Sequence, residues 1–226
     1  MIAQPDHSQL RQYLRLYLVM GSINCTQSPE KVLTSAIAGG ITLFQFREKG
    51  IGALTGQAYY QLAQRLQHIC REHNIPFIVN DDIELAIALD ADGIHVGQED
   101  IPADQIRARL GPNKIIGVSA HSVAEAKQAI QDGADYLGIG PIYPTTSKAD
   151  AKAVQGTSTI TALKNHQIHI PLVGIGGIHA DNAEPTLTAG ADGIAVISAI
   201  AGQDNVVQAT KRLNALTKHF IANREQ

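Results

Sequence analysis

The sequence has few of the residues on which several protein classes depend. It contains two cysteines, Cys25 and Cys70, no tryptophan, and only 4% aromatic residues. The two cysteines lack the spacing of a zinc or redox motif, and two in 226 residues do not make a disulfide framework. We therefore expect buried free thiols in a protein that is neither a zinc module nor a disulfide-stapled domain.

Excess charge and long apolar runs are also missing. The 18 Lys and Arg residues face 21 Asp and Glu residues, which gives a formal net charge of -3. This balance offers no basic surface to nucleic acid, so any anion site must be local. No run approaches the ~18 apolar residues of a membrane span, and the opening MIAQPDHSQL lacks the basic and apolar regions of a secretion signal. We expect a soluble cytoplasmic protein with no membrane or nucleic-acid partner.

Short β-branched runs alternate with amphipathic segments along the whole chain. This alternation is typical of βα units around a parallel sheet. Eight strands are predicted, at 14–20, 41–46, 76–80, 92–97, 115–119, 135–140, 171–176 and 192–198. With 44% hydrophobic residues available for a core, we predict a single α/β domain over 1–226, a (β/α)8 TIM barrel, with about 1–12 as a loose or capping extension.

Three similar phrases, at 88–93, 131–136 and 188–193, each precede a predicted strand. Gly133 and Gly190 suit the left-handed position that follows a helix, and the next two residues make a short turn into the strand. We interpret these phrases as structural turns at the end of the barrel away from the active site.

The carboxyl ends of the strands are the segments in which a barrel builds its active site, and here they are polar. After the second strand, side-chain alternation places Gln45, Arg47 and Lys49 on the face that points into the barrel mouth, with Phe46 and Glu48 on the other. Two cations at this spacing suit a polyphosphate. Taken alone, the segment favours an ordinary surface ion pair between Arg47 and Glu48, and only the pattern of all the strand ends reverses that preference.

Carboxylates end the third and fourth strands. Asn80, Asp81 and Asp82 follow one strand and Asp100 lies just past the other. Neighbouring strands are about 4.8 Å apart, and Mg²⁺ takes one or two protein carboxylates with water and substrate phosphate. We predict that Asp81 and Asp100 bind Mg²⁺, with Mn²⁺ left open. Helix capping is the alternative for both, and it is the preferred role of Asp82.

Hydroxyl groups and glycines end the last three strands. Thr145, Thr146, Ser147 and Lys148 form a turn suited to phosphate, although such a turn is also common in solvated loops. The strand-seven end has a glycine pair that includes Gly176, and the strand-eight end has Ile197 and Ser198. Barrels bind a single phosphate at these ends, through backbone amides and the N-terminus of a short helix.

The fifth strand ends at Ser119, followed by His121. We expect the Ser119 hydroxyl to point into the mouth. His121 stays unassigned, because a loop histidine beside an N-cap such as Ser122 is usually incidental.

Together the fragments FQFREK, FIVNDD, DGIHVGQED, GVSAHS, YLGIGPIYPTTSKAD, VGIGGI and GIAVISAI resemble, in order, the thiamine-phosphate synthase family. The resemblance implies a transferase that joins 4-amino-2-methyl-5-hydroxymethylpyrimidine diphosphate to 4-methyl-5-(2-hydroxyethyl)thiazole phosphate, with Mg²⁺ at Asp81 and Asp100. Diphosphate would leave first, and the thiazole nitrogen would attack the resulting cation. The family usually has Thr where Ser147 stands and Leu where Phe46 stands.

The resemblance also implies roles for individual residues. Arg47, Lys49, Ser119 and Lys148 would be catalytic. The pyrimidine diphosphate would be bound by these four with Gln45, Phe46, Glu48 and Asn80. The thiazole phosphate would be bound by Thr145, Thr146, Ser147, Gly176, Ile197 and Ser198.

Two alternative functions remain open at this point. One is an isomerase resembling thiazole tautomerase, for which His121 stands at the position of the proton-transferring histidine. The other is a non-catalytic barrel that binds phosphorylated ligands. The diphosphate-binding residues favour the synthase over both. The oligomeric state is open, a homo-oligomer included.

Overall fold

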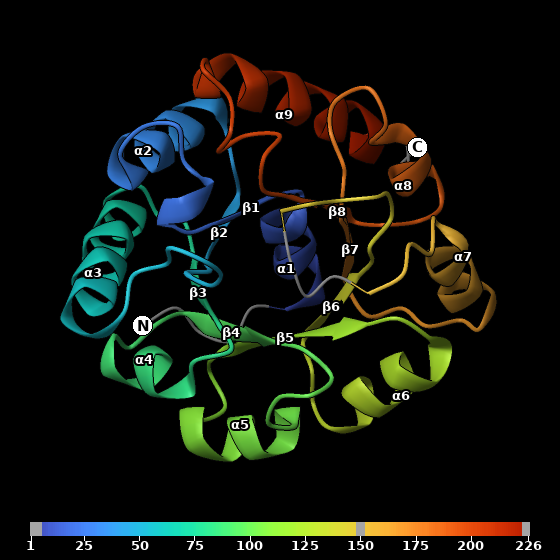
Figure 1. Ribbon diagram of the computed structural model, residues 1–226. Helices are drawn as coiled ribbons and strands as arrows, with labels where there is room; N and C mark the ends of the chain where they lie inside the picture. Colours follow the sequence, from blue (N-terminus) through green and yellow to red (C-terminus); the bar gives the residue numbers. More distant parts are fainter. Residues whose placement is uncertain (1–5, 148–151, 223–226) are drawn as a thin grey trace.

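The computed structural model describes residues 6–147 and 152–222. Its strands form a closed parallel barrel in which each strand pairs with the next and β8 pairs with β1 (Figure 1). The strands are β1 Leu16–Met20, β2 Leu43–Phe46, β3 Phe77–Asn80, β4 Gly93–Val96, β5 Ile115–Ala120, β6 Tyr136–Ile139, β7 Leu172–Ile175 and β8 Gly193–Val196. The predicted TIM barrel is therefore confirmed, and each predicted strand overlaps one observed strand.

Helices follow the strands and surround the barrel (Figure 1). Two begin at the cap that the sequence indicated: the Ser122 hydroxyl accepts a hydrogen bond from Glu125 N at the start of α6, and the Asp82 carboxylate accepts one from Leu85 N at the start of α4. The helices are α1 His7–Leu14, α2 Pro29–Gly39, α3 Gly56–Glu72, α4 Ile83–Ala88, α5 Ala103–Leu110, α6 Val123–Gln131, α7 Ser158–Asn165, α8 Glu184–Thr188 and α9 Val206–Ala222, with a 3-10 turn η1 at Ser22–Asn24.

The repeated phrases lie in the turns between helices and strands, as predicted. Gly133 has φ +89° and Gly190 has φ +116°, the left-handed conformation that glycine adopts without strain. Gly133 directly follows Asp132, the C-cap of α6, and Gly190 directly follows Ala189, the C-cap of α8. These segments are structural.

Two apolar layers hold the barrel together. Side chains that alternate along each strand point either outward, against the helices, or into the barrel. In β4, for example, Ile94 and Val96 belong to the outer layer. The inner layer contains Tyr17, Val19, Leu43, Ile78, Ile115, Tyr136, Val173 and Ala195.

The N-terminal helix closes one end of the barrel. Leu10 and Leu14 of α1 are 2% and 0% exposed and pack into the inner layer of the barrel. Arg11 holds the helix in place through an ion pair with Asp192 at 2.7 Å and a hydrogen bond to the His169 carbonyl oxygen. Of the two roles predicted for the first dozen residues, the described part has the capping one.

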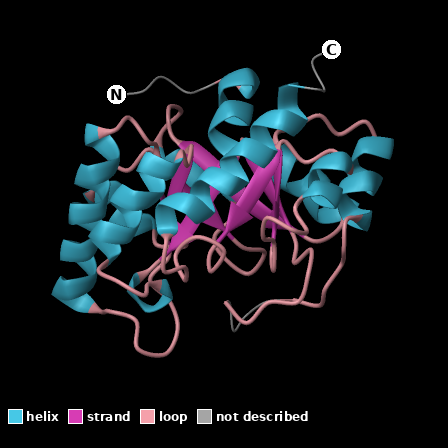
Figure 2. Cartoon of the chain, turned by 90° about the horizontal axis from the view of Figure 1, so that it is seen from above, coloured by secondary structure: helices cyan, strands magenta, loops and turns pink. Residues whose placement is uncertain are grey.

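The longer loops gather at one end of the barrel (Figure 2). The α1 helix directly precedes β1, so it closes the amino-terminal end of the strands and leaves the carboxyl-terminal end to these loops. Over the described parts of the chain, none of the helices combines the length and the apolar character that crossing a membrane requires. The two cysteines are free, Cys70 buried and Cys25 only half-buried.

Candidate active site

A cavity of about 520 Å³ opens at the carboxyl-terminal end of the strands. Most of its polar lining comes from the loops after β2, β3, β4, β5 and β6. The side chains and backbone that line it include Arg47, Lys49, Asn80, Asp81, His95, Gln98, Glu99, Asp100, Ser119, His121, Thr145, Lys152 and Gly176. The polar strand ends of the sequence therefore converge on one cavity.

The cations after β2 face this cavity. Arg47 is only 6% exposed, which is too buried for the surface ion pair with Glu48 that the segment alone allowed. The Lys49 ammonium lies 3.0 Å from Asp81 Oδ2. Gln45 points to the same side but lies deeper, 2% exposed, where its Nε2 donates to the Tyr17 hydroxyl at 2.7 Å.

The side chains of Phe46 and Glu48, assigned to the substrate by the resemblance, point away from the cavity. Phe46 packs outside the barrel against Tyr59, with ring centroids 5.3 Å apart. The Glu48 carboxylate accepts hydrogen bonds from Ser22 N at 2.6 Å and Leu54 N at 2.7 Å. Phe46 therefore packs behind the β2 strand, and Glu48 ties the loops after β1 and β2 together. The prediction that their side chains contact the substrate is corrected: both point away from the cavity.

The two carboxylates predicted to bind metal are neighbours. Asp100 Oδ2 accepts a hydrogen bond from Gly97 N at 2.7 Å, and Asp81 adopts φ +59°, a left-handed conformation that turns the chain at the strand end. Burial raises the pKa of Asp100, and the nearby Asp81 carboxylate raises that pKa further. A cation between them would relieve both effects.

Helix capping explains neither carboxylate. The cap of α4 is Asp82, as predicted, and α5 begins after Pro102. Among the described residues, no group of three or more His, Cys, Asp and Glu side chains gathers to hold a metal ion. Two carboxylates facing an open cavity fit Mg²⁺, which keeps most of its ligands as water and substrate phosphate.

A smaller cavity adjoins the first and shares Thr145, Ile175 and Gly176 with it. It is also lined by Ser147, Gly177, Ile197 and Ser198, and the Ser147 and Ser198 hydroxyl oxygens lie 3.3 Å apart. The glycines have φ +101° and +63°, and a Cβ at either would overlap the Pro141–Pro144 segment. Glycine is required here for the two strand ends to approach each other.

Three details of this second cavity differ from the sequence prediction or extend it. Residues 198–202 form a turn in place of the short helix that commonly binds phosphate after strand eight. Thr146 does not line the smaller cavity, but it lines a further groove together with Thr145, Ser147 and Ser198. Lys148 lies outside the described residues.

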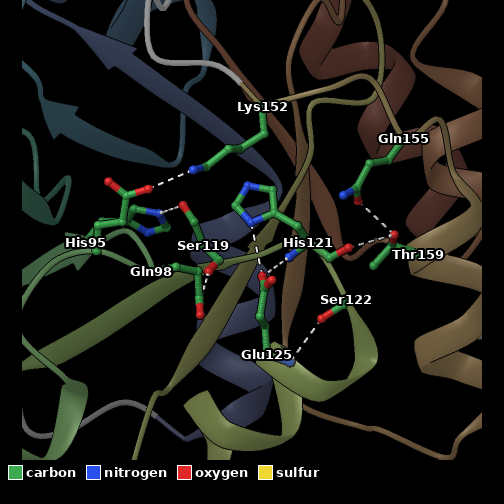
Figure 3. A network of polar contacts seen from close by, with 10 residues as sticks. His95, Gln98, Ser119, His121, Ser122, Glu125, Lys152, Gln155 and Thr159 are labelled. Carbon is green, nitrogen blue, oxygen red and sulfur yellow. Dashed lines mark hydrogen bonds and ion pairs between the residues drawn. The ribbon is translucent and has the colours of Figure 1, made fainter.

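Sequence reasoning missed several residues at the mouth. His95 lies between the outward-facing Ile94 and Val96, so the same alternation that placed Gln45 would have placed it inside the barrel. Lys152, in the loop after β6, pairs with Glu99 at 2.7 Å across the mouth (Figure 3). His121, left unassigned, lines the cavity with its Nδ1 3.1 Å from Glu125 Oε2.

Comparison with known proteins agrees with this geometry. Residues 16–200 match the family model described as thiamine monophosphate synthase. The chain is 53% identical over 206 residues to thiamine-phosphate synthase of Bacillus cereus (strain ZK / E33L), covering 91% of this chain and 94% of that protein. The solved thiamine phosphate pyrophosphorylase from Pyrococcus furiosus is 36% identical and superimposes with a TM-score of 0.83 over 94% of this chain and 99% of the other. The chain therefore belongs to the thiamine-phosphate synthase family.

Proposed function

We propose that this protein is a transferase that condenses hydroxymethylpyrimidine diphosphate with hydroxyethylthiazole phosphate, giving thiamine phosphate and diphosphate. The observation that carries the proposal is the pairing of two anion-binding regions in one mouth. One holds cations and a carboxylate pair, and the adjoining one holds hydroxyls and glycines. Two such regions suit two phosphorylated substrates.

The first region is assigned to the pyrimidine diphosphate. Arg47 presents a planar guanidinium for phosphate oxygens, and Lys49 adds a mobile positive charge. Asn80 and Ser119 line the same cavity and offer an amide and a hydroxyl. Lys148 is predicted to complete this set.

The carboxylates of Asp81 and Asp100 are assigned to Mg²⁺. When bound, this ion neutralises the negative charge of the diphosphate. Asp81 and Asp100 would hold it, and Lys49, 3.0 Å from Asp81 Oδ2, would add positive charge beside it. The site as a whole then keeps a net positive charge facing the diphosphate.

The smaller cavity is assigned to the thiazole phosphate. The Ser147 and Ser198 hydroxyls approach each other across it, and the backbone of Gly176 and Gly177 is left accessible by the absence of side chains. Thr145 lines both cavities, so it stands at the boundary between the two substrates.

These positions suit a reaction in which diphosphate leaves before the new bond forms. Positive charge around the leaving group lowers the barrier to its departure without an added acid. The second substrate is held in the adjoining cavity with its nucleophile directed to the same mouth, which converts the second step into a positioned reaction. No strong nucleophile of the protein is needed.

The direct test incubates the purified protein with both substrates and Mg²⁺ and follows thiamine phosphate by mass spectrometry and diphosphate by ³¹P NMR. We expect equal amounts of the two products, and none when EDTA removes the metal. Absence of both products in the presence of Mg²⁺ would reject the proposal.

The tautomerase alternative has one supporting observation, the position of His121 in the cavity beside Glu125. It does not account for the carboxylate pair or for the buried Arg47. Turnover of the thiazole substrate alone, without the pyrimidine and with EDTA present, would favour it. Binding of both substrates with no turnover would favour the non-catalytic barrel. A cytoplasmic location and the lack of nucleic-acid partners stay predictions from composition.

A further inference from the structure

A continuous line of polar contacts crosses the inside of the barrel below the mouth. Gln45 Nε2 donates to the Tyr17 hydroxyl at 2.7 Å, and that hydroxyl lies 2.9 Å from the Tyr136 hydroxyl. Tyr136 lies 2.9 Å from His95 Nδ1, and His95 Nε2 lies 2.9 Å from Ser119 Oγ. The line ends at a side chain that faces the active-site cavity.

Two glycines make room for this line. A Cβ at position 117 would overlap the Tyr136 ring, and a Cβ at position 138 would lie 3.0 Å from His95 Cε1. Neither glycine has a positive φ, so backbone conformation does not require glycine at either position. Their effect is to admit an aromatic ring and an imidazole into the barrel interior.

The two tyrosines keep their protons. Both are fully buried, and burial raises the pKa of each hydroxyl above its ordinary value. Either tyrosine hydroxyl could donate to the other, and either His95 Nδ1 or the Tyr136 hydroxyl could donate in the next bond. Because Tyr17 already accepts from Gln45, we take the arrangement in which Tyr17 donates to Tyr136 and Tyr136 donates to His95 Nδ1. A neutral imidazole that accepts at Nδ1 carries its proton on Nε2.

The direction of these bonds determines what Ser119 can do. When His95 Nε2 donates to Ser119 Oγ, the serine accepts from inside the protein and its own hydroxyl proton is left for the cavity. The Ser119 backbone is held as well, because Gln98 Nε2 donates to its carbonyl oxygen at 2.6 Å (Figure 3). Ser119 is thus fixed from two sides by β4 and the loop that follows it.

We propose that His95 is a positioning residue that fixes Ser119 as a hydrogen-bond donor to the departing diphosphate, with Tyr136 and Tyr17 selecting the imidazole tautomer. The inference rests on the proposed function, since it refines the role of Ser119 in that site. It predicts that the deeply buried Tyr136 hydroxyl, which contacts the cavity-lining His95, affects the rate through Ser119.

The first test is Tyr136→Phe, which removes the hydroxyl and leaves the ring beside Gly117. We expect kcat to fall about three- to tenfold, the effect of weakening one hydrogen bond that strengthens as charge develops. KM for the pyrimidine substrate should change less than kcat. In ¹⁵N NMR of histidine-labelled protein, His95 should show the Nε2–H tautomer in the unchanged protein and a mixture in the variant. An unchanged tautomer and rate would overturn the proposal.

The second test is the double variant Tyr136→Phe with Ser119→Ala. If Tyr136 acts through Ser119, the double variant should be no slower than Ser119→Ala alone. If the losses of kcat caused by the two single substitutions multiplied in the double variant, the proposal would be overturned. The control is Tyr13→Phe, which removes a hydroxyl that contacts Gln9 on α1 and should leave the rate unchanged.

A conservative replacement separates positioning from packing. His95→Gln keeps an amide N–H that can donate to Ser119, whereas His95→Ala keeps none. We expect His95→Gln to retain at least several-fold more activity than His95→Ala at equal thermal stability. Equal activity of the two folded variants would contradict the proposed role.

One measurement distinguishes failure of this inference from failure of the proposed function. Inorganic diphosphate with Mg²⁺ is titrated into the protein by calorimetry, which requires no turnover. Weaker binding in both Ser119→Ala and Tyr136→Phe, with the expected tautomer change, would support the positioning line even if no thiamine phosphate forms. If the unchanged protein turns over and Tyr136→Phe shows neither weaker diphosphate binding nor a tautomer change, the positioning role of His95 is rejected and the proposed function is retained.

Discussion

The two ends of the barrel differ in side-chain character: one is filled by apolar residues and the other is lined by charged ones. At the amino-terminal end, Leu10 and Leu14 of α1 fill the opening and the inner layer is apolar. At the carboxyl-terminal end, Arg47, Asp81 and Asp100 surround an open cavity. The closed end gains stability from buried apolar area, whereas the mouth gathers charged side chains around an open cavity. Substitutions at the two ends should therefore change different properties.

The largest effect is expected at the carboxylate pair. Asp81→Asn should lower kcat/KM by about 100- to 1,000-fold, because a neutral amide is a poorer ligand for Mg²⁺ and leaves the diphosphate less neutralised. Steady-state rates at saturating Mg²⁺ measure this. The matched control is Asp82→Asn one residue away, since asparagine also caps α4. Equal losses in the two variants would place the effect in the helix and not in the metal site.

At the closed end, Leu14→Ala should affect stability and not catalysis. Removing a fully buried leucine side chain costs about 2–5 kcal/mol of unfolding free energy, and Leu14 is 0% exposed. Urea denaturation measures the loss, and both KM values should stay unchanged. Ile130→Ala on α6, where the side chain is 38% exposed, is the control and should cost far less. A changed KM in folded Leu14→Ala would mean that the two ends are coupled.

Within the mouth, the smaller cavity can be separated from the larger one. Ser147→Ala or Ser198→Ala should raise KM for the thiazole phosphate about ten- to a hundredfold, the effect of losing one hydrogen bond to a charged group. KM for the pyrimidine diphosphate should hardly change. Ser158→Ala, where the hydroxyl bonds the Gln155 carbonyl oxygen, is the control. The opposite pattern, with only the pyrimidine KM affected, would exchange the two assignments.

The smallest effect concerns acidity. Burial, and then the neighbouring Asp81, raise the pKa of Asp100. Protons compete with Mg²⁺ for the carboxylate, so as pH falls through this raised pKa the ligand is lost earlier than an exposed aspartate would be. As pH falls, calorimetric Mg²⁺ affinity should begin to weaken at a higher pH than the ordinary aspartate pKa would give, and less so in Asp100→Asn, which has no such proton. An affinity independent of pH over that range would contradict this.

Much of this contrast was predictable from the sequence. The eight strands follow from apolar periodicity, and the polar strand ends at Gln45–Lys49 and Asn80–Asp82 locate the mouth, because parallel strands in a barrel all end on one side. Alternation also placed Arg47 correctly. It contradicted the assignment of Phe46 and Glu48 to the substrate, which came from the resemblance.

The remaining features depend on contacts between elements that are far apart in the sequence, and local sequence patterns do not predict such contacts. That α1 closes the barrel requires Leu10 and Leu14 to meet residues from several strands. The line from Gln45 to Ser119 joins side chains of five strands, and its contacts depend on the register between them. The pairing of Lys152 with Glu99 links two loops that are 53 residues apart.

In the proposed function, Asp81 and Asp100 hold the Mg²⁺ that assists the release of diphosphate. The most direct measurement is the initial rate of thiamine phosphate formation against free Mg²⁺, for the unchanged protein and for Asp81→Asn with Asp100→Asn. We expect a saturable dependence on Mg²⁺ that falls to background without metal, and a double variant that stays near background at all concentrations. An undiminished rate without free metal, or a double variant as fast as the unchanged protein, would contradict the role of Mg²⁺ at Asp81 and Asp100.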